Sequence, residues 1–83
     1  MTAARVLVVE DTATAAEQLT RYLEELGAEV TAVGEGNRVV QIVRDERPAL
    51  VCLDLGLPDS SGWEVLADLK ADPRTAGVPV VVV

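Results

Sequence analysis

Short apolar runs along this chain alternate with longer amphipathic stretches. Three of the runs are continuous and rich in β-branched residues, which is typical of strands buried on both faces of a parallel sheet. They cover residues 6–9, 50–53 and 78–83. Residues 29–33 alternate instead, with Val30 and Ala32 on one side, and this pattern predicts a strand at the edge of the sheet.

Three amphipathic stretches separate these strands and predict helices. The first has apolar residues at positions i, i+3, i+4 and i+7, which lie on one face of a helix, and the stripe ends at Gly27. Its members are Leu19, Tyr22, Leu23 and Leu26. The second helix is predicted from about residue 37 to 46, before Pro48, and the third from Ser61 to a point before Pro73.

Capping and packing residues follow from the same spacing. Two pairs have the three-residue separation of a capping box, at the starts of the first and third helices. They are Thr14 with Glu17 and Ser61 with Glu64. The second and third helices are predicted to bury Val39, Val40, Ile42, Val43, Val65, Leu66 and Leu69.

The predicted elements alternate between strand and helix, beginning and ending with a strand. A short crossover through a helix requires the strands that it connects to be parallel. The predicted fold class is therefore α/β, with a doubly wound parallel sheet. A chain of 83 residues has room for a single small domain.

Composition and charge narrow the possible functions. Hydrophobic residues make up 49% of the chain, so a disordered chain is excluded. The net charge of −7 repels phosphate backbones and anionic lipid, so we expect no direct contact with nucleic acid or membrane. The absence of His excludes His-based catalysis. A single Cys and the lack of a run long enough for a signal peptide or membrane span predict a cytoplasmic location.

Acidic residues follow two of the predicted buried strands. Glu10 and Asp11 come directly after the first strand, and Asp54 follows the third. If the strand order is 2-1-3-4, all three lie where the strand order reverses, the place at which α/β sheets bind ligands. Three neighbouring carboxylates need a cation or protonation, and Mg²⁺ favours such oxygens. The alternative is that each acid only solubilises a loop or caps a helix.

Two segments carry a resemblance to a known family. VLVVED at residues 6–11 and LDLGLPDSSG at residues 53–62 resemble the receiver domain of two-component response regulators. The acid pair, Asp54, Pro58 four residues later and Gly62 eight residues later have the family's spacing. The resemblance implies the flavodoxin-like receiver fold, with strand order 2-1-3-4.

The resemblance also implies roles for the acidic residues. Asp54 is expected to be the phosphoacceptor, which receives its phosphoryl group from a sensor histidine kinase or a phosphotransfer protein. Mg²⁺ is expected as cofactor, held by the side chains of Asp11 and Asp54 and by the backbone carbonyl of Gly56. Glu10 is expected to act through a water. Such a domain is a signalling switch and not an enzyme.

Other residues near these segments have structural interpretations. Leu57, Pro58 and Gly62 match family positions that shape the loop between the third strand and the third helix. Cys52, inside a strand, is predicted to be a small core residue. Trp63, in the first turn of the third helix, is predicted to pack in the ordinary way.

The resemblance covers residues 5–83 and breaks off there. A complete receiver has five strand–helix units, so we expect residues 1–83 to form a partial receiver domain without the fifth strand and the last two helices. The family's Ser or Thr after the fourth strand, and its Lys after the fifth, would both fall beyond Val83. An open apolar edge is expected at the fourth strand, which favours a homo-oligomer or a fragment of a longer protein.

Two other classes of function remain open. A phosphorylation-silent pseudo-receiver, or a truncated fragment, would act as a protein-interaction module. A haloacid-dehalogenase-type enzyme would need a second Asp where Gly56 stands, and a dinucleotide site would need a glycine-rich turn at residues 10–14.

Overall fold

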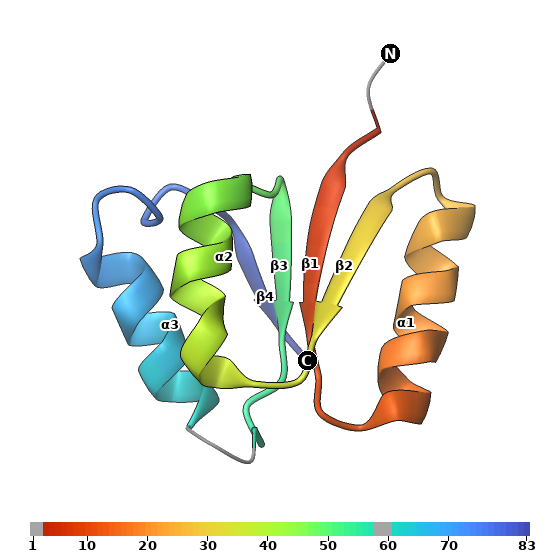
Figure 1. Ribbon diagram of the computed structural model, residues 1–83, viewed down its shortest axis with the longest axis horizontal. Helices are drawn as coiled ribbons and strands as arrows, with labels where there is room; N and C mark the ends of the chain where they lie inside the picture. Colours follow the sequence, from red (N-terminus) through yellow and green to blue (C-terminus); the bar gives the residue numbers. More distant parts are fainter. Residues whose placement is uncertain (1–2, 58–60) are drawn as a thin grey trace.

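The computed structural model describes residues 3–57 and 61–83, and within these ranges one parallel sheet carries helices on both faces (Figure 1). The strands are β1 (Arg5–Val9), β2 (Glu29–Val33), β3 (Leu50–Leu53) and β4 (Val80–Val82). The helices are α1 (Ala13–Glu25), α2 (Val39–Glu46), which follows a 3₁₀ turn (Gly36–Arg38), and α3 (Gly62–Ala71). The strand order is β2-β1-β3-β4. The predicted doubly wound α/β fold with order 2-1-3-4 is confirmed.

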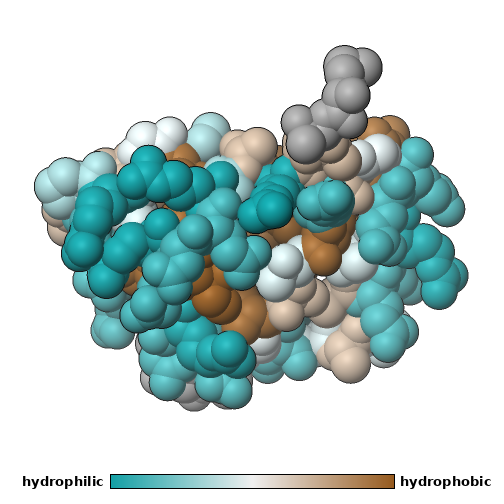
Figure 2. All heavy atoms as spheres, turned by 45° about the horizontal axis from the view of Figure 1, so that its top comes forward, coloured by the Kyte–Doolittle hydropathy of each residue, from teal (hydrophilic) through white to brown (hydrophobic). Residues whose placement is uncertain are grey.

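The sheet has a hydrophobic core on each face, because successive strand residues point to opposite sides. Leu7, Val9, Val51 and Leu53 belong to the larger core, beneath α2 and α3. Those helices contribute Val39, Val43, Val65 and Leu69, as predicted. The smaller core contains Val6, Val8 and Cys52, against which Leu19 and Leu23 of α1 pack. Figure 2 shows apolar atoms in a central band between the hydrophilic outer surfaces of the helices.

Only half of the apolar stripe of α1 is partly buried, and the other half is exposed. Leu19 and Leu23 pack against the smaller core, whereas Tyr22 is 61% and Leu26 is 69% exposed. The predicted helix is confirmed, and these two members of its apolar stripe lie in solvent. The reason is that α1 packs mainly against β1 and β2, and no second described helix lies beside it to cover its flank (Figure 1).

The helix starts differ in how they are capped. α1 begins at Ala13 with Thr12 as its N-cap, so the predicted Thr14 capping box is wrong. The Oε1 atom of Glu10 accepts a hydrogen bond from the Thr12 N–H at 3.1 Å, which draws the start of the helix toward the acidic pair. The predicted Ser61 cap of α3 is confirmed, and its hydroxyl accepts from the Trp63 N–H at 3.2 Å.

The predictions for Trp63 and Cys52 have opposite outcomes. Trp63 is 63% exposed, so the prediction that it packs in the ordinary way is wrong. The first turn of α3 directs Val65 into the core and leaves the preceding aromatic ring in solvent. Cys52 is buried, as predicted, and its burial raises the pKa of the thiol. A thiol of this kind is a poor nucleophile, because the reactive form is the thiolate.

β4 lies at the edge of the sheet, and among the described residues it pairs with β3 alone. Val81, Val82 and Val83 are all exposed. The expected apolar edge is thus confirmed, while the homo-oligomer expected from it stays a prediction. None of the helices in the described ranges has the length and apolar character needed to cross a membrane.

Asp72 joins the end of α3 to α2 and to the following loop. Its carboxylate accepts from the Arg74 N–H at 2.9 Å and from Arg74 Nε at 3.2 Å, and it lies 3.4 Å from an Arg44 guanidinium nitrogen. The hydrogen bond from the Arg74 backbone, aided by the Arg74 side chain, lowers the pKa of Asp72. A lowered pKa in the folded state means that the ionised form stabilises the fold.

We predict that Asp72→Asn destabilises the chain at neutral pH and that this difference shrinks in acid. The stabilisation from ionised Asp72 is fully present above the ordinary pKa of an Asp, about 4, and is lost as the pH falls through the lowered folded value. Urea unfolding of both proteins between pH 7 and pH 3 measures the difference. A difference in unfolding free energy that stays constant over this pH range would contradict the stabilising role of ionised Asp72.

Candidate functional site

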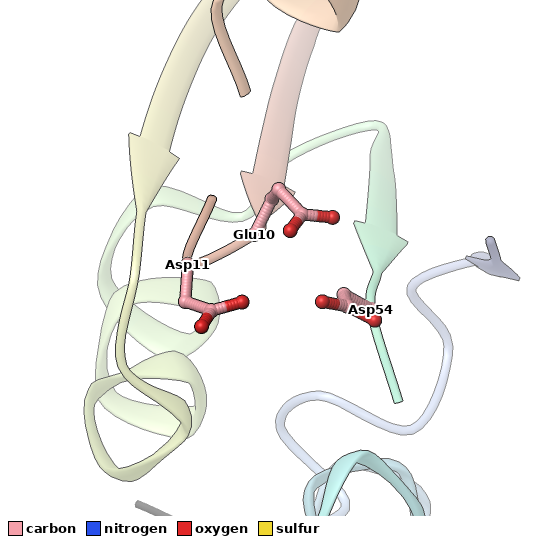
Figure 3. Close-up of side chains that lie close together, drawn as sticks. All are labelled: Glu10, Asp11 and Asp54. Atoms are coloured by element: carbon pink, nitrogen blue, oxygen red, sulfur yellow. The ribbon is translucent and has the colours of Figure 1, made fainter. Parts of the chain in front are cut away.

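Three carboxylates meet at the carboxyl ends of two adjacent strands. Glu10 and Asp11 follow β1, and Asp54 follows β3. The parallel register places Val9 opposite Leu53, and the Asp54 N–H donates to the Val9 carbonyl at 2.9 Å. One carboxylate oxygen from each acid lies within 4.8 Å of the others. In Figure 3 the Asp11 and Asp54 carboxylates point toward each other across the space between the strands, and Glu10 extends into the same space.

Backbone hydrogen bonds hold two of these acids in place. The Glu10 N–H donates to the Val33 carbonyl at 3.0 Å, and its side chain accepts from Thr12. The Oδ1 atom of Asp54 accepts from the Gly56 N–H at 3.0 Å. Glu10 and Asp54 are half-buried and Asp11 is exposed, so the cluster faces solvent on one side.

No described cation neutralises this cluster. The ion pairs within residues 3–57 and 61–83 join Arg5 to Glu29, and Arg44 and Arg74 to Asp72. None of these ion pairs involves Glu10, Asp11 or Asp54. Three converging carboxylates without a partner cation form a donor set that suits a hard divalent ion.

The loop after β3 brings backbone close to Asp54. A Cβ on Gly56 would lie 3.7 Å from the Oδ1 atom of Asp54, so the glycine keeps that side of the carboxylate open. The expected role of the Gly56 carbonyl as a Mg²⁺ ligand stays a prediction. Leu57 is buried in the larger core, consistent with a role in shaping the loop. Pro58 lies outside the described residues.

Gly62 fits against the same loop from the other side. Its N–H donates to the Leu55 carbonyl at 3.1 Å. A Cβ at this position would overlap the Leu55 Cα and lie 2.7 Å from the Asp54 carbonyl oxygen. The start of α3 can approach the Asp54 backbone this closely only with glycine at position 62.

The family model for the response regulator receiver domain matches residues 6–83. The chain belongs to this family. Receiver domains are signalling modules rather than classical enzymes, and their general function is to accept a phosphoryl group from histidine kinases or phosphotransfer proteins. The predicted family is thus confirmed.

Receiver-containing relatives share substantial sequence with the chain. The DNA-binding response regulator MtrA of Mycobacterium tuberculosis is 44% identical over 77 residues, which are 93% of this chain and 32% of MtrA. Protein PilH of Pseudomonas aeruginosa is 34% identical over 80 residues, which are 96% of this chain and 66% of PilH. The chain therefore spans about a third of the length of MtrA and just under two thirds of the length of PilH.

Solved receiver structures superimpose closely on the chain. A response regulator from Chloroflexus aurantiacus gives a TM-score of 0.93 at 26% identity, over 98% of this chain and 66% of the other. The receiver domain of sensor histidine kinase PA1611 from Pseudomonas aeruginosa gives 0.92 at 25% identity, with the same coverage. That structure has a magnesium ion coordinated in its active-site cleft.

Some contacts of the receiver site were not foreseen. The Gly56–Asp54 hydrogen bond could have been found, because an Asp often accepts from the backbone N–H two residues later. The contact of the Gly62 position with the Asp54 carbonyl could not, since it depends on how α3 packs against the loop. Pattern alone also gives no sign that the Thr12 N–H donates to Glu10.

We predict that Gly62→Ala destabilises the fold by about 1–3 kcal/mol, because the added methyl group overlaps backbone that cannot move independently. Gly77→Ala is the matched control: a Cβ there has nothing within 4 Å, so its effect should stay within about 0.5 kcal/mol. Urea unfolding measures both. Equal stability of the two variants would show that the Gly62 contact relaxes without cost.

We predict that Asp11→Asn stabilises the chain by about 0.5 kcal/mol at low salt in the presence of a chelator, because it removes one of three mutually repelling charges. The gain should fall in 0.3 M NaCl, since salt screens exposed charges. Thermal unfolding at the two salt concentrations measures it. Asp68→Asn removes an exposed acid outside the cluster and serves as control, and the same gain in both variants would contradict the repulsion within the site.

Proposed function

We propose that this chain is a phosphoacceptor receiver domain in which Asp54 receives a phosphoryl group from a sensor histidine kinase or a phosphotransfer protein. One observation carries the proposal: Asp54 lies at the end of a central strand with the Glu10 and Asp11 carboxylates within 4.8 Å of it. The family membership supplies the class of reaction, and the geometry supports the choice of residue.

Asp54 is suited to act as a nucleophile. Its Oδ1 atom is engaged by the Gly56 N–H, whereas Oδ2 accepts no hydrogen bond from a described residue. Oδ2 attacks the phosphorus of the phosphohistidine, and an O–P bond forms while the P–N bond breaks. The electron pair of the P–N bond stays on the imidazole nitrogen, and the product is an aspartyl phosphate. Gly56 places no side chain in the path of the donor.

The acidic cluster fits a magnesium ion. One carboxylate oxygen from each of the three acids lies within 4.8 Å of the others, and oxygen atoms are the ligands that Mg²⁺ prefers. Asp11, Asp54 and the Gly56 carbonyl would hold the ion, with Glu10 acting through a water. When bound, Mg²⁺ offsets the negative charge of the carboxylates and of the entering phosphoryl oxygens. The magnesium-containing PA1611 receiver supports this assignment.

We predict that acetyl phosphate and Mg²⁺ add one phosphoryl group to the chain and that Asp54→Asn abolishes the addition, because the amide cannot act as the nucleophile. Intact-mass spectrometry measures the adduct directly. A chelator should prevent its formation, since the repulsion between the acidic cluster and the donor is then not offset.

Asp68→Asn is the matched control, because it removes an exposed acid of α3 without touching the cluster, and it should be labelled like the parent chain. An adduct of equal yield on the Asp54→Asn variant would overturn the assignment of the phosphoacceptor. Complete lack of labelling, with Mg²⁺ still bound, would favour the alternative of a phosphorylation-silent interaction module.

A further inference from the structure

The outer edge of β2 is open. β2 ends the sheet, and among the described residues it pairs with β1 alone. The Glu29 N–H donates to the Ala4 carbonyl at 2.8 Å, and the Val33 carbonyl accepts from Glu10. Because alternate residues of a strand direct their backbone groups to opposite sides, Val30 and Ala32 direct theirs outward, away from β1.

A groove runs beside this open edge. It has a volume of about 360 Å³ and lies between α1 and β2. Its lining residues are Ala16, Glu17, Thr20, Arg21, Glu24 and Ala32. Ala32 therefore contributes both to the wall of the groove and to the outward-facing backbone of the edge strand.

The polar side chains of the groove lack partners among the residues that the structure describes. Glu17, Arg21 and Glu24 are exposed, and none of them forms an ion pair or a side-chain hydrogen bond with a described residue. The Oγ1 atom of Thr20 is buried and has no hydrogen-bond partner among the residues that the structure describes. A buried hydroxyl without a partner is costly, and Thr20 is one of the residues that line the groove.

We propose that this groove binds an extended segment of a partner protein, which adds to β2 as a further strand and places a Lys or Arg side chain between Glu17 and Glu24. Strand addition uses backbone hydrogen bonds for affinity and a neighbouring pocket for specificity. Here the outward N–H and C=O groups of Val30 and Ala32 supply the backbone hydrogen bonds, and the groove serves as the neighbouring pocket.

Charge and shape favour a basic side chain as occupant. Two carboxylates and one guanidinium line the groove, so its net charge is negative, as is that of the chain at −7. The methyl groups of Ala16 and Ala32 offer apolar contact to the aliphatic stem of a Lys or Arg, whose charged head can then reach the glutamates. A second copy of the chain is the weaker candidate, because two chains of this charge repel each other.

The site is separate from the phosphoacceptor. None of the groove residues belongs to the Glu10, Asp11 and Asp54 cluster. The proposal therefore does not depend on phosphorylation of Asp54, and it can fail or succeed independently of the proposed function.

The test is a titration of the ¹⁵N-labelled chain, in excess Mg²⁺, with the capped peptide Val-Arg-Val-Arg-Val, followed by amide chemical shifts. The expected result is a set of shifts at Val30, Ala32 and the groove-lining residues of α1. The double variant Glu17→Gln/Glu24→Gln should weaken binding about tenfold. The neutral peptide Val-Gln-Val-Gln-Val should bind as weakly to the parent chain as the basic peptide binds to this variant.

Two further variants distinguish strand addition from general charge attraction. Glu64→Gln/Asp68→Asn removes the same charge from exposed positions of α3 and should leave binding unchanged. Ala32→Pro removes an outward N–H and is compatible with an edge strand, so it should abolish binding while the amide spectrum shows an intact fold. Three results would each overturn the proposal. The two charge-removing double variants could weaken binding equally, or the peptide could shift only the amides of the acidic cluster. The third is self-association of the chain without peptide binding.

Discussion

The parallel pairing of β1 with β3 is the constraint on which the rest of this structure depends. These two strands are adjacent in the sheet although about forty residues separate them, and their register sets Leu53 opposite Val9. Acidic residues follow both strands at the same level of the sheet. The pairing that buries residues 6–9 between the helices on the two faces therefore also brings three negative charges together at one edge. Burial of the apolar strands stabilises an arrangement that the carboxylates alone would oppose.

The elements that were predicted correctly are those whose signal is local and repeated. Continuous apolar runs identified β1, β3 and β4, and alternation identified β2 as an edge strand. The acidic residues were placed correctly because parallel strands bring their carboxyl ends together. The family resemblance supplied the strand order, which the pattern of residues alone left conditional.

The predictions that were wrong concern the surroundings of an element rather than its existence. The helical spacing of Tyr22 and Leu26 did predict α1 but gave no information about neighbours, and both residues lie on a flank that no described helix covers. Thr14 has the spacing of a cap, yet the Thr12 N–H bonds to Glu10 and the helix begins before Thr14. Trp63 was expected to pack because large aromatic rings usually do, but the first turn of α3 leaves it in solvent.

The exposure of Trp63 has an optical consequence. It is the only indole in the chain, so tryptophan emission arises from a single position. That position is next to Gly62, which packs against the Asp54 backbone, and its own N–H is held by the Ser61 hydroxyl. The chain thus carries a built-in spectroscopic reporter one residue away from the loop that bears its central acid, and it needs no attached label.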